Sequence, residues 1–401
     1  MKTSVYLFLA FLAIFSFSGC EDDDDARPGF TTPETFTFSR DGQSTVSFTG
    51  QTTRIAMAEE LTAALLDFDR SAADLNNMFR NVAGTAPFAD AELNASTKSV
   101  RSKVAASADL FSANTAASAA IRSTFDGWIA SQVTDVFPNE NEVATQGQAG
   151  QLADGSSTRY VSANGYEYNQ FFAKSLIGGL MYDQLANNYL SPAVLDRDGG
   201  RQANDDGVLV DGKPYTAMEH FWDEAYGYLF GAAANPANGL ADLGTADGFL
   251  NKYLGRVETD ADYAGIAARI ERAFRTGRAA IVAGNYTVRD QQADLIKAEL
   301  AKVIAVRAVY YLQQGKTALT AQPANFGGAF HDLSEGLGFV YSLRFTEQLD
   351  GTPGATLSEE ATAQLLNAAN GGFWTLGAAE LDNLSASIAA AYGLSVTEAG
   401  N

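Results

Sequence analysis

The chain has 401 residues, a hydrophobic content of 46% and a formal net charge of −21. This strongly acidic balance argues against nucleic acid or an anionic lipid surface as a partner. A chain of this length and hydrophobic content can bury one large core or two medium ones.

The N-terminal segment predicts export and lipidation. Lys2 precedes an apolar run from Val5 to Phe17, which is too short for an ordinary membrane span, and Ser18-Gly19-Cys20 resembles a lipobox. Cys20 is the only cysteine, and its position makes it the expected lipid-bearing first residue of the mature protein. An ordinary signal peptide followed by a chance cysteine is the alternative. These features predict a signal peptide at residues 1–19 and a lipoprotein of the bacterial outer membrane.

Five acidic residues, Glu21 to Asp25, follow the cysteine directly. They cannot form a packed core, so residues 20–34 are expected to be a lipidated, solvated tether. The acidic run resembles the surface-export signal of some lipoproteins of Gram-negative bacteria, and a plain linker is the competing interpretation. The mature protein is therefore expected in the periplasm or on the cell surface, with the membrane as its partner through the lipid anchor.

The first predicted secondary structure is a β-hairpin. Residues 35–40 and 44–48 alternate apolar and polar side chains on either side of Asp41-Gly42. A three-residue loop that also includes Gln43 would align Phe38 with Val46, which a two-residue turn would not do, so we predict the longer loop. A lone hairpin is marginal in water, and this one is expected to pack on the helical body as a lid or clasp.

Helical periodicity begins at Arg54 and recurs in most of the later segments. Residues 139–158 are polar and Gly-rich, so they are expected to be a loop that could separate lobes at 35–140 and 160–401. No strand pattern occurs after residue 50. The sequence therefore predicts an all-α helical domain over residues 35–401 with a small N-terminal β-hairpin. The expected helices are 54–79, 96–111, 114–136, 164–190, 217–230, 243–254, 260–283, 290–314, 329–341, 356–369 and 378–392.

The chain's only two histidines, His220 and His331, lie in similar segments. Each is followed by Glu at position +4, Gly at +7 and aromatic residues at +8 and +10, which indicates an internal duplication. Helices 164–190 and 290–314 share an Ala-Lys pair followed by Tyr eight residues after the Lys, so they are the expected partners of the two histidine helices. The repeated unit is then a helix, a loop and a His-Glu helix, and two such units could form a four-helix bundle.

The two histidines and their neighbouring acids are the candidate functional residues. Residues four apart share one face of a helix, so His220 is expected beside Glu224, and His331 beside Glu335. If both pairs pointed to one interior, two imidazoles and two carboxylates would converge, a set suited to zinc, iron or manganese. Further acids near this set are Asp223, Asp332 and Glu167.

A structural role for the same residues is the alternative interpretation. A buried histidine is often held by a hydrogen bond to a carboxylate, and Gly227 and Gly338 would let helices approach closely. The chain has no HExxH helix, no Walker loop and no GxSxG elbow, so none of these motifs supports a catalytic role.

Residues 47–61, 219–227 and 331–345 together resemble an uncharacterised bacterial lipoprotein family, domain of unknown function 4856. The resemblance spans nearly the whole mature chain and implies no established activity. More distantly, the duplicated His-Glu hairpins resemble imelysin-like proteins, which are two-lobed, all-helical exported proteins associated with iron uptake and once classed as metallopeptidases. Their Gly-x-His-x-x-Glu signature has Glu at +3, where this chain has Asp223 and Ser334.

These resemblances imply a non-enzymatic, lipid-anchored binding protein of the envelope or cell surface that takes part in iron or other metal acquisition. Outer-membrane uptake proteins are then the expected partners, and iron or zinc the candidate metal. One alternative is a metal-dependent peptidase, in which a metal-bound water attacks a carbonyl and Glu224 acts as base. The other is a structural scaffold of a surface complex. The residues expected at the centre are His220, Glu224, His331, Glu335 and Asp223.

Overall fold

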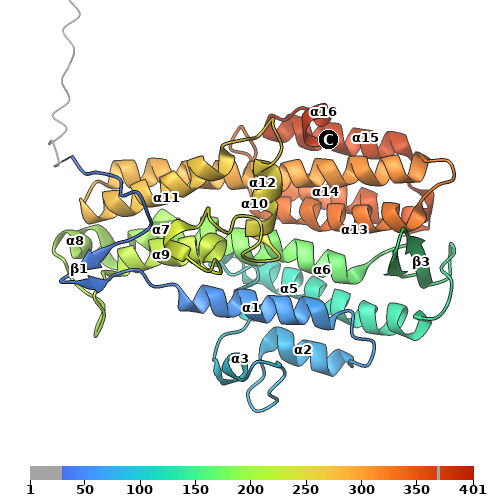
Figure 1. Cartoon of the computed structure of the whole chain (residues 1–401), viewed down its shortest axis with the longest axis horizontal. Helices are drawn as coiled ribbons and strands as arrows, with labels where there is room; N and C mark the ends of the chain where they lie inside the picture. The colour runs from blue at the N-terminus through green and yellow to red at the C-terminus, as the bar shows by residue number, and fades with distance from the viewer. Residues whose placement is uncertain (1–28, 368–370) are drawn as a thin grey trace, which may run out of the picture.

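The computed structural model describes residues 29–367 and 371–401, and Figure 1 shows the long helices lying along the long axis of the molecule. This part of the chain is all-α apart from two small, two-stranded antiparallel sheets, which confirms the predicted fold class. The predicted signal peptide, Cys20 and the acidic run Glu21 to Asp25 lie outside the described residues. None of the described helices is both long and apolar enough to cross a membrane.

The elements of the described part follow one another in a simple order. The strands are β1 (Ser39–Arg40), β2 (Gln43–Ser44), β3 (Gly150–Asp154) and β4 (Ser157–Val161). The helices are α1 (Thr49–Ala64), α2 (Ala72–Arg80), α3 (Ala91–Ala95), α4 (Ala108–Phe111), α5 (Thr115–Ser131), α6 (Tyr168–Leu176), α7 (Pro192–Leu195), α8 (Gly200–Asp205), α9 (Ala217–Phe230), α10 (Leu250–Glu258), α11 (Ile266–Val282), α12 (Tyr286–Thr320), α13 (Phe326–Ser342), α14 (Ala355–Leu366), α15 (Ala378–Tyr392) and α16 (Val396–Ala399). Two helices continue in π-helical geometry, α5 through η2 (Gln132–Val136) and α6 through η4 (Ile177–Tyr182) and η5 (Leu185–Tyr189).

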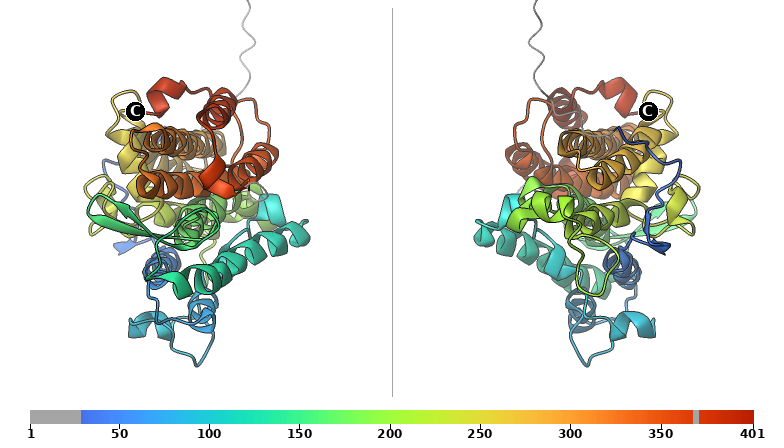
Figure 2. Two further views of the ribbon diagram at one scale, coloured as in Figure 1. Left: turned by 90° about the vertical axis from the view of Figure 1, so that its right-hand side faces the viewer. Right: turned by 90° about the vertical axis from the view of Figure 1, so that its left-hand side faces the viewer.

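The helices are stacked in layers across the long axis. Helix α2 packs on α1, α1 on α6, α6 on α13, α13 on α12 and α12 on α15. Figure 1 shows this order from bottom to top, and Figure 2 shows the same stack from its two ends. Buried apolar side chains from Phe36 to Ala399 belong to one continuous cluster. The boundary between lobes at 35–140 and 160–401 stays a prediction.

Helix α12 is the longest element of the described part, with 35 residues. The Asn285 side chain accepts a hydrogen bond from the Val288 backbone N–H and so caps its first turn. Most side chains from Leu300 to Leu312 are buried, because α11, α13 and α15 all pack against this helix. The predicted helix 290–314 is therefore confirmed, and it extends further in both directions.

The N-terminal hairpin forms as predicted, but its predicted loop is wrong. The register of β1 and β2 leaves only Asp41 and Gly42 in the turn. Both have positive φ, 51° and 78°, which is the conformation that an Asp-Gly pair adopts in a two-residue hairpin turn. The pairing of phenylalanines that favoured a longer loop is not needed, because Phe36 stacks instead on Tyr226 of α9, with ring centroids 3.7 Å apart.

The predicted helix 96–111 is also wrong. Only η1 (Arg101–Lys103) and the short helix α4 are helical in this segment. Ala105 has a φ of +48°, which no α-helix accommodates, and its backbone N–H bonds to the Gly179 carbonyl of η4 instead of to its own segment. A contact with a distant helix therefore overrides the local Ala-rich pattern.

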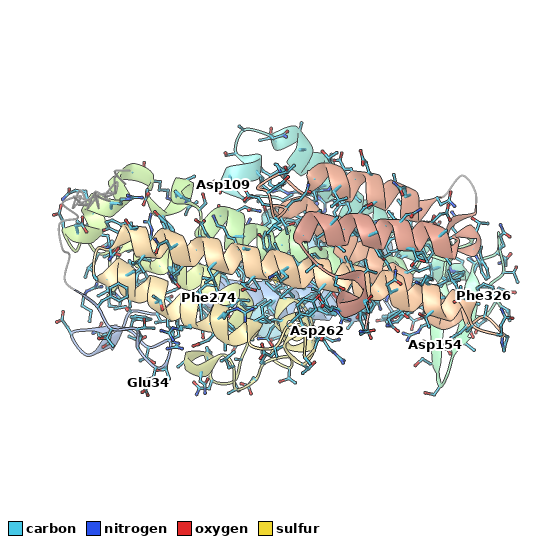
Figure 3. The ribbon with its side chains drawn as sticks, turned by 90° about the horizontal axis from the view of Figure 1, so that it is seen from above. Glu34, Asp109, Asp154, Asp262, Phe274 and Phe326 are labelled. Carbon is cyan, nitrogen blue, oxygen red and sulfur yellow. The ribbon has the colours of Figure 1, made fainter. Side chains whose placement is uncertain are left out.

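The predicted loop 139–158 contains β3 and the start of β4, so the expectation of no strand after residue 50 is wrong. Gly155, with a φ of +58°, lies in the turn, and an ion pair of 2.7 Å joins Arg159 to Asp154 across it. The Asn325 side chain donates to Asp154, which ties this hairpin to the start of α13. Figure 3 shows Asp154 and Phe326 at one end of the molecule and Glu34 at the other.

The glycines of the two histidine helices stand at close helix crossings, as predicted. A Cβ added at Gly227 would lie 2.4 Å from Phe48 Cβ, and one added at Gly338 would lie 2.4 Å from Lys174 Cβ. Helix α1 thus crosses α9, and α6 crosses α13, seven residues after each histidine. Of the predicted partner helices, η5 contacts α9 and α12 packs along α13, whereas the contact of α6 with α13 was not expected. The internal duplication stays a prediction.

Candidate functional site

His220 and Glu224 lie on one face of α9. A capping box starts this helix, in which Thr216 Oγ1 accepts from the Glu219 N–H at 3.3 Å and Glu219 Oε2 accepts from the Thr216 N–H at 2.7 Å. His220 Nε2 is 3.9 Å from Glu224 Oε1, which is longer than a hydrogen bond, and the two side chains are 27% and 19% exposed. The predicted i, i+4 neighbours are therefore brought together and reach solvent. We call them the His220 site.

The imidazole of His220 keeps hydrogen-bonding capacity. Its ring stacks on Tyr215 at 4.7 Å, and Nδ1 is buried with no hydrogen-bond partner among the described residues. Burial lowers the pKa of His220, although the charge of Glu224 and the Ser47 backbone act in the opposite direction. Because Nδ1 is enclosed by the protein, Nε2, which makes no hydrogen bond to a described residue, is the nitrogen that can bind a ligand.

Glu224 is held by residues from distant parts of the chain. Gln51 Nε2, fully buried on α1, donates to Glu224 Oε1 at 2.9 Å and lies 3.4 Å from the Tyr189 hydroxyl. Burial raises the pKa of Tyr189, and the charge of Glu224 adds to this effect. The carboxylate is therefore fixed by α1 and η5.

Lys103 lies close enough to Glu224 and to three further cations for their charges to act on its pKa. None of these four cations has an ion-pair partner within 4.0 Å among the described residues, and we call them the cation cluster: Arg54, Lys98, Lys103 and Arg197. Arg54 is buried, Lys103 half-buried and the other two exposed. Burial lowers the pKa of Lys103, and the positive charges of the other three act in the same direction. One carboxylate amid four unpaired cations leaves local positive charge in a chain whose net charge is −21.

Asp223 does not join the His220 site. It is fully buried, and Arg278 Nε donates to its Oδ1 at 2.9 Å. Arg278 also pairs with Glu219 at 3.0 Å, and Arg40 of the hairpin pairs with the same carboxylate at 3.0 Å. Burial raises the pKa of Asp223 to about 7, against the charge of Arg278. This buried network clasps the N-terminal hairpin to α9 and α11.

His331, near the start of α13, has its ring nitrogens directed at two carboxylates. Nδ1 is 2.9 Å from Glu167 Oε2 and Nε2 is 3.7 Å from Glu335 Oε1. Burial alone would lower the pKa of His331, but the hydrogen bond to Glu167 and the charges of both carboxylates outweigh it and raise the pKa. The ring is thus held by charge-assisted contacts, as the structural interpretation expects.

The acids beside His331 are compensated inside the protein. Lys174 Nζ on α6 is 3.2 Å from Glu335 Oε1, and both side chains are 9% exposed. Burial would raise the pKa of Glu335, but the charges of Lys174 and His331 outweigh it and lower the pKa. Asp332, by contrast, has its pKa raised to about 6, chiefly by burial.

The two centres are alike in construction and separate in space. In each, a residue on the crossing helix donates to the Glu, Gln51 at one centre and Lys174 at the other. The contacts of His220 and His331 have no residue in common, and Figure 1 shows α9 and α13 in different halves of the molecule. They differ in one respect, because Nδ1 of His331 pairs with Glu167, whereas Nδ1 of His220 has no hydrogen-bond partner among the described residues.

Neither centre is a complete metal site in itself. Within residues 29–367 and 371–401, no group of three or more His, Cys, Asp or Glu side chains is arranged to hold a metal ion. At His331 the two carboxylates face different ring nitrogens, so they cannot share one ion with it. At the His220 site, an atom pair 3.9 Å apart could share one ion at the usual ligand distance of about 2 Å, with its remaining ligands supplied from outside.

Several residues of these centres were not predicted from the sequence. Gln51 contacts Glu224 across 173 positions, and the cation cluster is assembled from four separate segments. Lys174 is the lysine of the Ala-Lys pair in the predicted helix 164–190, which indicates a repeat but no role at this centre. The one signal in the sequence was that Gln51 lies within the stretch that carries the family resemblance.

We expect the two histidines to titrate on opposite sides of the ordinary pKa of about 6.5. His331 should lose its proton above that value and His220 below it, because one is paired with carboxylates and the other is buried beside cations. The mature protein should show two imidazole Cε1–H signals by NMR, which a His331→Gln variant assigns. Equal titration of the two rings, or the reverse order, would contradict the described surroundings.

The same shifts fix the sign of their effects on stability. His331, with its raised pKa, contributes stability that is complete below about 6.5 and is lost as the pH rises through its folded-state pKa. His220, with its lowered pKa, contributes stability above about 6.5 that is lost as the pH falls through its folded-state pKa.

Comparison with known proteins identifies a family but no activity. The family model described as domain of unknown function (DUF4856) matches residues 33–395. No curated protein and no solved structure matches the chain. The resemblance to imelysin-like proteins stays a prediction. Because the match covers most of the chain, the protein belongs to the DUF4856 family.

Proposed function

We propose that this protein is a non-enzymatic, lipid-anchored binding protein of the bacterial outer membrane, and that it binds a metal ion carried in an anionic chelate at the His220 site. The observation that carries the proposal is a part-exposed imidazole and carboxylate set among four unpaired cations. The role in iron or other metal acquisition, and outer-membrane uptake proteins as partners, are parts of the same proposal.

The cation cluster favours an anionic ligand. Arg54, Lys98, Lys103 and Arg197 repel a free divalent cation and attract carboxylate or phosphate groups. Arg197 in particular can bind a carboxylate through two parallel N–H donors, whereas Arg54 already donates to the backbone carbonyls of Ser99 and Gly50 and contributes its charge. A chelate whose net charge is negative would therefore be attracted to this surface although the whole chain is acidic.

The imidazole favours a metal within that ligand. His220 is held neutral by burial, and neutral imidazole binds zinc and iron well. Glu224 lies close enough to contribute a second ligand or to orient the ring. His331 is a weaker candidate because Glu167 and Glu335 already occupy the surroundings of both its nitrogens.

The proposal is tested by equilibrium dialysis of the mature protein against ferric citrate, ferric ion at low citrate, and zinc, followed by elemental analysis. We expect near-stoichiometric iron from ferric citrate, at least about tenfold weaker binding in Lys103→Gln and His220→Gln, and little change in His331→Gln. Absence of bound metal from every source, or equal loss in His220→Gln and His331→Gln, would overturn it.

The two other functions predict different outcomes for the same variants. A metal-dependent peptidase would cleave peptides only with added metal, and would lose this cleavage in Glu224→Gln. A scaffold would show a lower free energy of unfolding in either histidine variant and unchanged affinity for every ligand. Either result would replace the binding proposal.

A further inference from the structure

Arg307, on α12, is a buried cation with no acceptor in the part of the chain that the structure describes. Arg307 is 8% exposed, and its Nε is fully buried without a hydrogen-bond partner among the described residues. No hydrogen bond or ion pair joins any of its nitrogens to another described residue. A buried charged group is normally paired, so this guanidinium lacks the anion that its surroundings would lead one to expect.

Three tyrosine rings hold the guanidinium in place. Its central carbon is 3.9 Å from the ring centroid of Tyr310, 4.6 Å from that of Tyr311 and 5.6 Å from that of Tyr253. Ring faces stabilise the positive charge but leave the N–H groups in the guanidinium plane without acceptors. The tyrosines therefore fix the orientation of Arg307 and keep its donors available.

A cavity of about 350 Å³ opens beside this arginine, between α10, α12 and the C-terminal end of the chain. Helices α10 and α16 both contact α12, as Figure 1 shows. Arg256 and Thr259 of the α10 end face Arg307 and Tyr310 of α12 across it. The remaining lining residues are Val257, Asp260, Val306, Ala399 and Asn401. Its size is in the range of small-molecule binding sites.

The charges around the cavity favour an anion. Arg256 and Arg307 both lack an ion-pair partner within the part of the chain that the structure describes. Asp260 is the acidic side chain of the lining, and its Oδ1 already accepts from the Asp262 backbone N–H at 3.0 Å. Among the lining side chains, two arginines thus face one engaged carboxylate.

We propose that this cavity binds a small oxyanion, a phosphate or carboxylate group, with Arg307 as its main donor. The planar guanidinium offers two parallel N–H groups to such a group, Arg256 supplies a second positive charge, and the hydroxyl of Tyr310 can donate to a remaining oxygen. This site is distinct from the His220 site and does not depend on the function proposed for it.

The proposal is tested by titration calorimetry of the mature protein with inorganic phosphate, glycerol phosphate and acetate at constant ionic strength. At least one of these anions should bind at one site per chain. Whether a phosphate or acetate binds most tightly shows which class of oxyanion the cavity prefers. Arg307→Gln and Arg256→Gln should each weaken that binding by about tenfold or more. Arg256 is exposed, so its variant tests the site even if the loss of Arg307 disturbs the fold.

The matched control is Arg272→Gln on α11, which removes an exposed, unpaired positive charge outside the cavity and should leave affinity unchanged. The proposal is overturned if none of the three anions binds to the unaltered protein. It is equally overturned if Arg272→Gln weakens binding as much as Arg256→Gln does, because the attraction would then be general electrostatics.

Discussion

Replacement of Arg278 by methionine is expected to lower the free energy of unfolding by about 3–5 kcal/mol, the usual effect of breaking a buried ion pair. Arg278 is fully buried and donates to Asp223, Glu219 and Thr45. Methionine fills similar space but leaves Asp223 without its cation. Urea unfolding followed by circular dichroism measures the change.

The pH dependence of this loss has a definite sign. Burial already raises the pKa of Asp223 to about 7, and removal of Arg278 raises it further. A buried carboxyl with a raised folded-state pKa destabilises the fold when it ionises at higher pH. The loss of unfolding free energy in Arg278→Met should therefore become smaller at acidic pH, where Asp223 is protonated. The control is Arg269→Met, which breaks the ion pair of Arg269 with Glu299. The Arg269 side chain is 48% exposed, so this substitution should lower the free energy of unfolding by less than about 1 kcal/mol. Equal losses in the two variants would contradict the buried clasp.

Substitution of Gly338 by alanine is expected to cost about 1–3 kcal/mol, as overpacking does. The new methyl group would lie 2.4 Å from Lys174 Cβ, so α6 and α13 must separate. That movement would also lengthen the 3.2 Å contact of Lys174 with Glu335. Thermal and urea unfolding measure the loss, and an upfield or downfield shift of the His331 signal would report the movement at the neighbouring centre.

Gly127→Ala in α5 is the matched control for this substitution. A Cβ at Gly127 has no neighbouring heavy atom within 4 Å, so alanine should stabilise the helix by up to about 1 kcal/mol through its higher helix propensity. If Gly338→Ala were also neutral or stabilising, the close crossing of α6 and α13 would not be the reason for glycine at that position.

The parts of the fold that local patterns determine were predicted well. The segment 378–392 was expected to be a helix and is α15, and 114–136 is α5 with its π-helical continuation. Predictions were wrong where distant contacts decide the backbone, as at Ala105, whose N–H bonds to the carbonyl of Gly179. The first hairpin has a two-residue turn, because Phe36 stacks on Tyr226 of α9 and does not set the register, so the Asp-Gly preference decides the turn.

The candidate site was predictable only along the helix itself. The i, i+4 relation placed Glu224 beside His220 and Glu335 beside His331, as the structure has them. Which acid faces the interior depends on the opposite helix, so Asp223 could not be separated from Glu224 without knowing that Arg278 packs against it. The sequence also does not show that His331 pairs with Glu167 while Nδ1 of His220 has no partner among the described residues, because Glu167 lies 164 positions from His331.

The most direct test of the binding proposal is an NMR titration of the mature protein with gallium citrate, a diamagnetic counterpart of ferric citrate. The chain has only two histidines, so each imidazole signal reports one centre. Our account predicts a saturable shift of the His220 signal, an unchanged His331 signal, and a His220 shift in Lys103→Gln that needs at least about tenfold more gallium citrate. A shift confined to His331, or no shift of either ring, would contradict it.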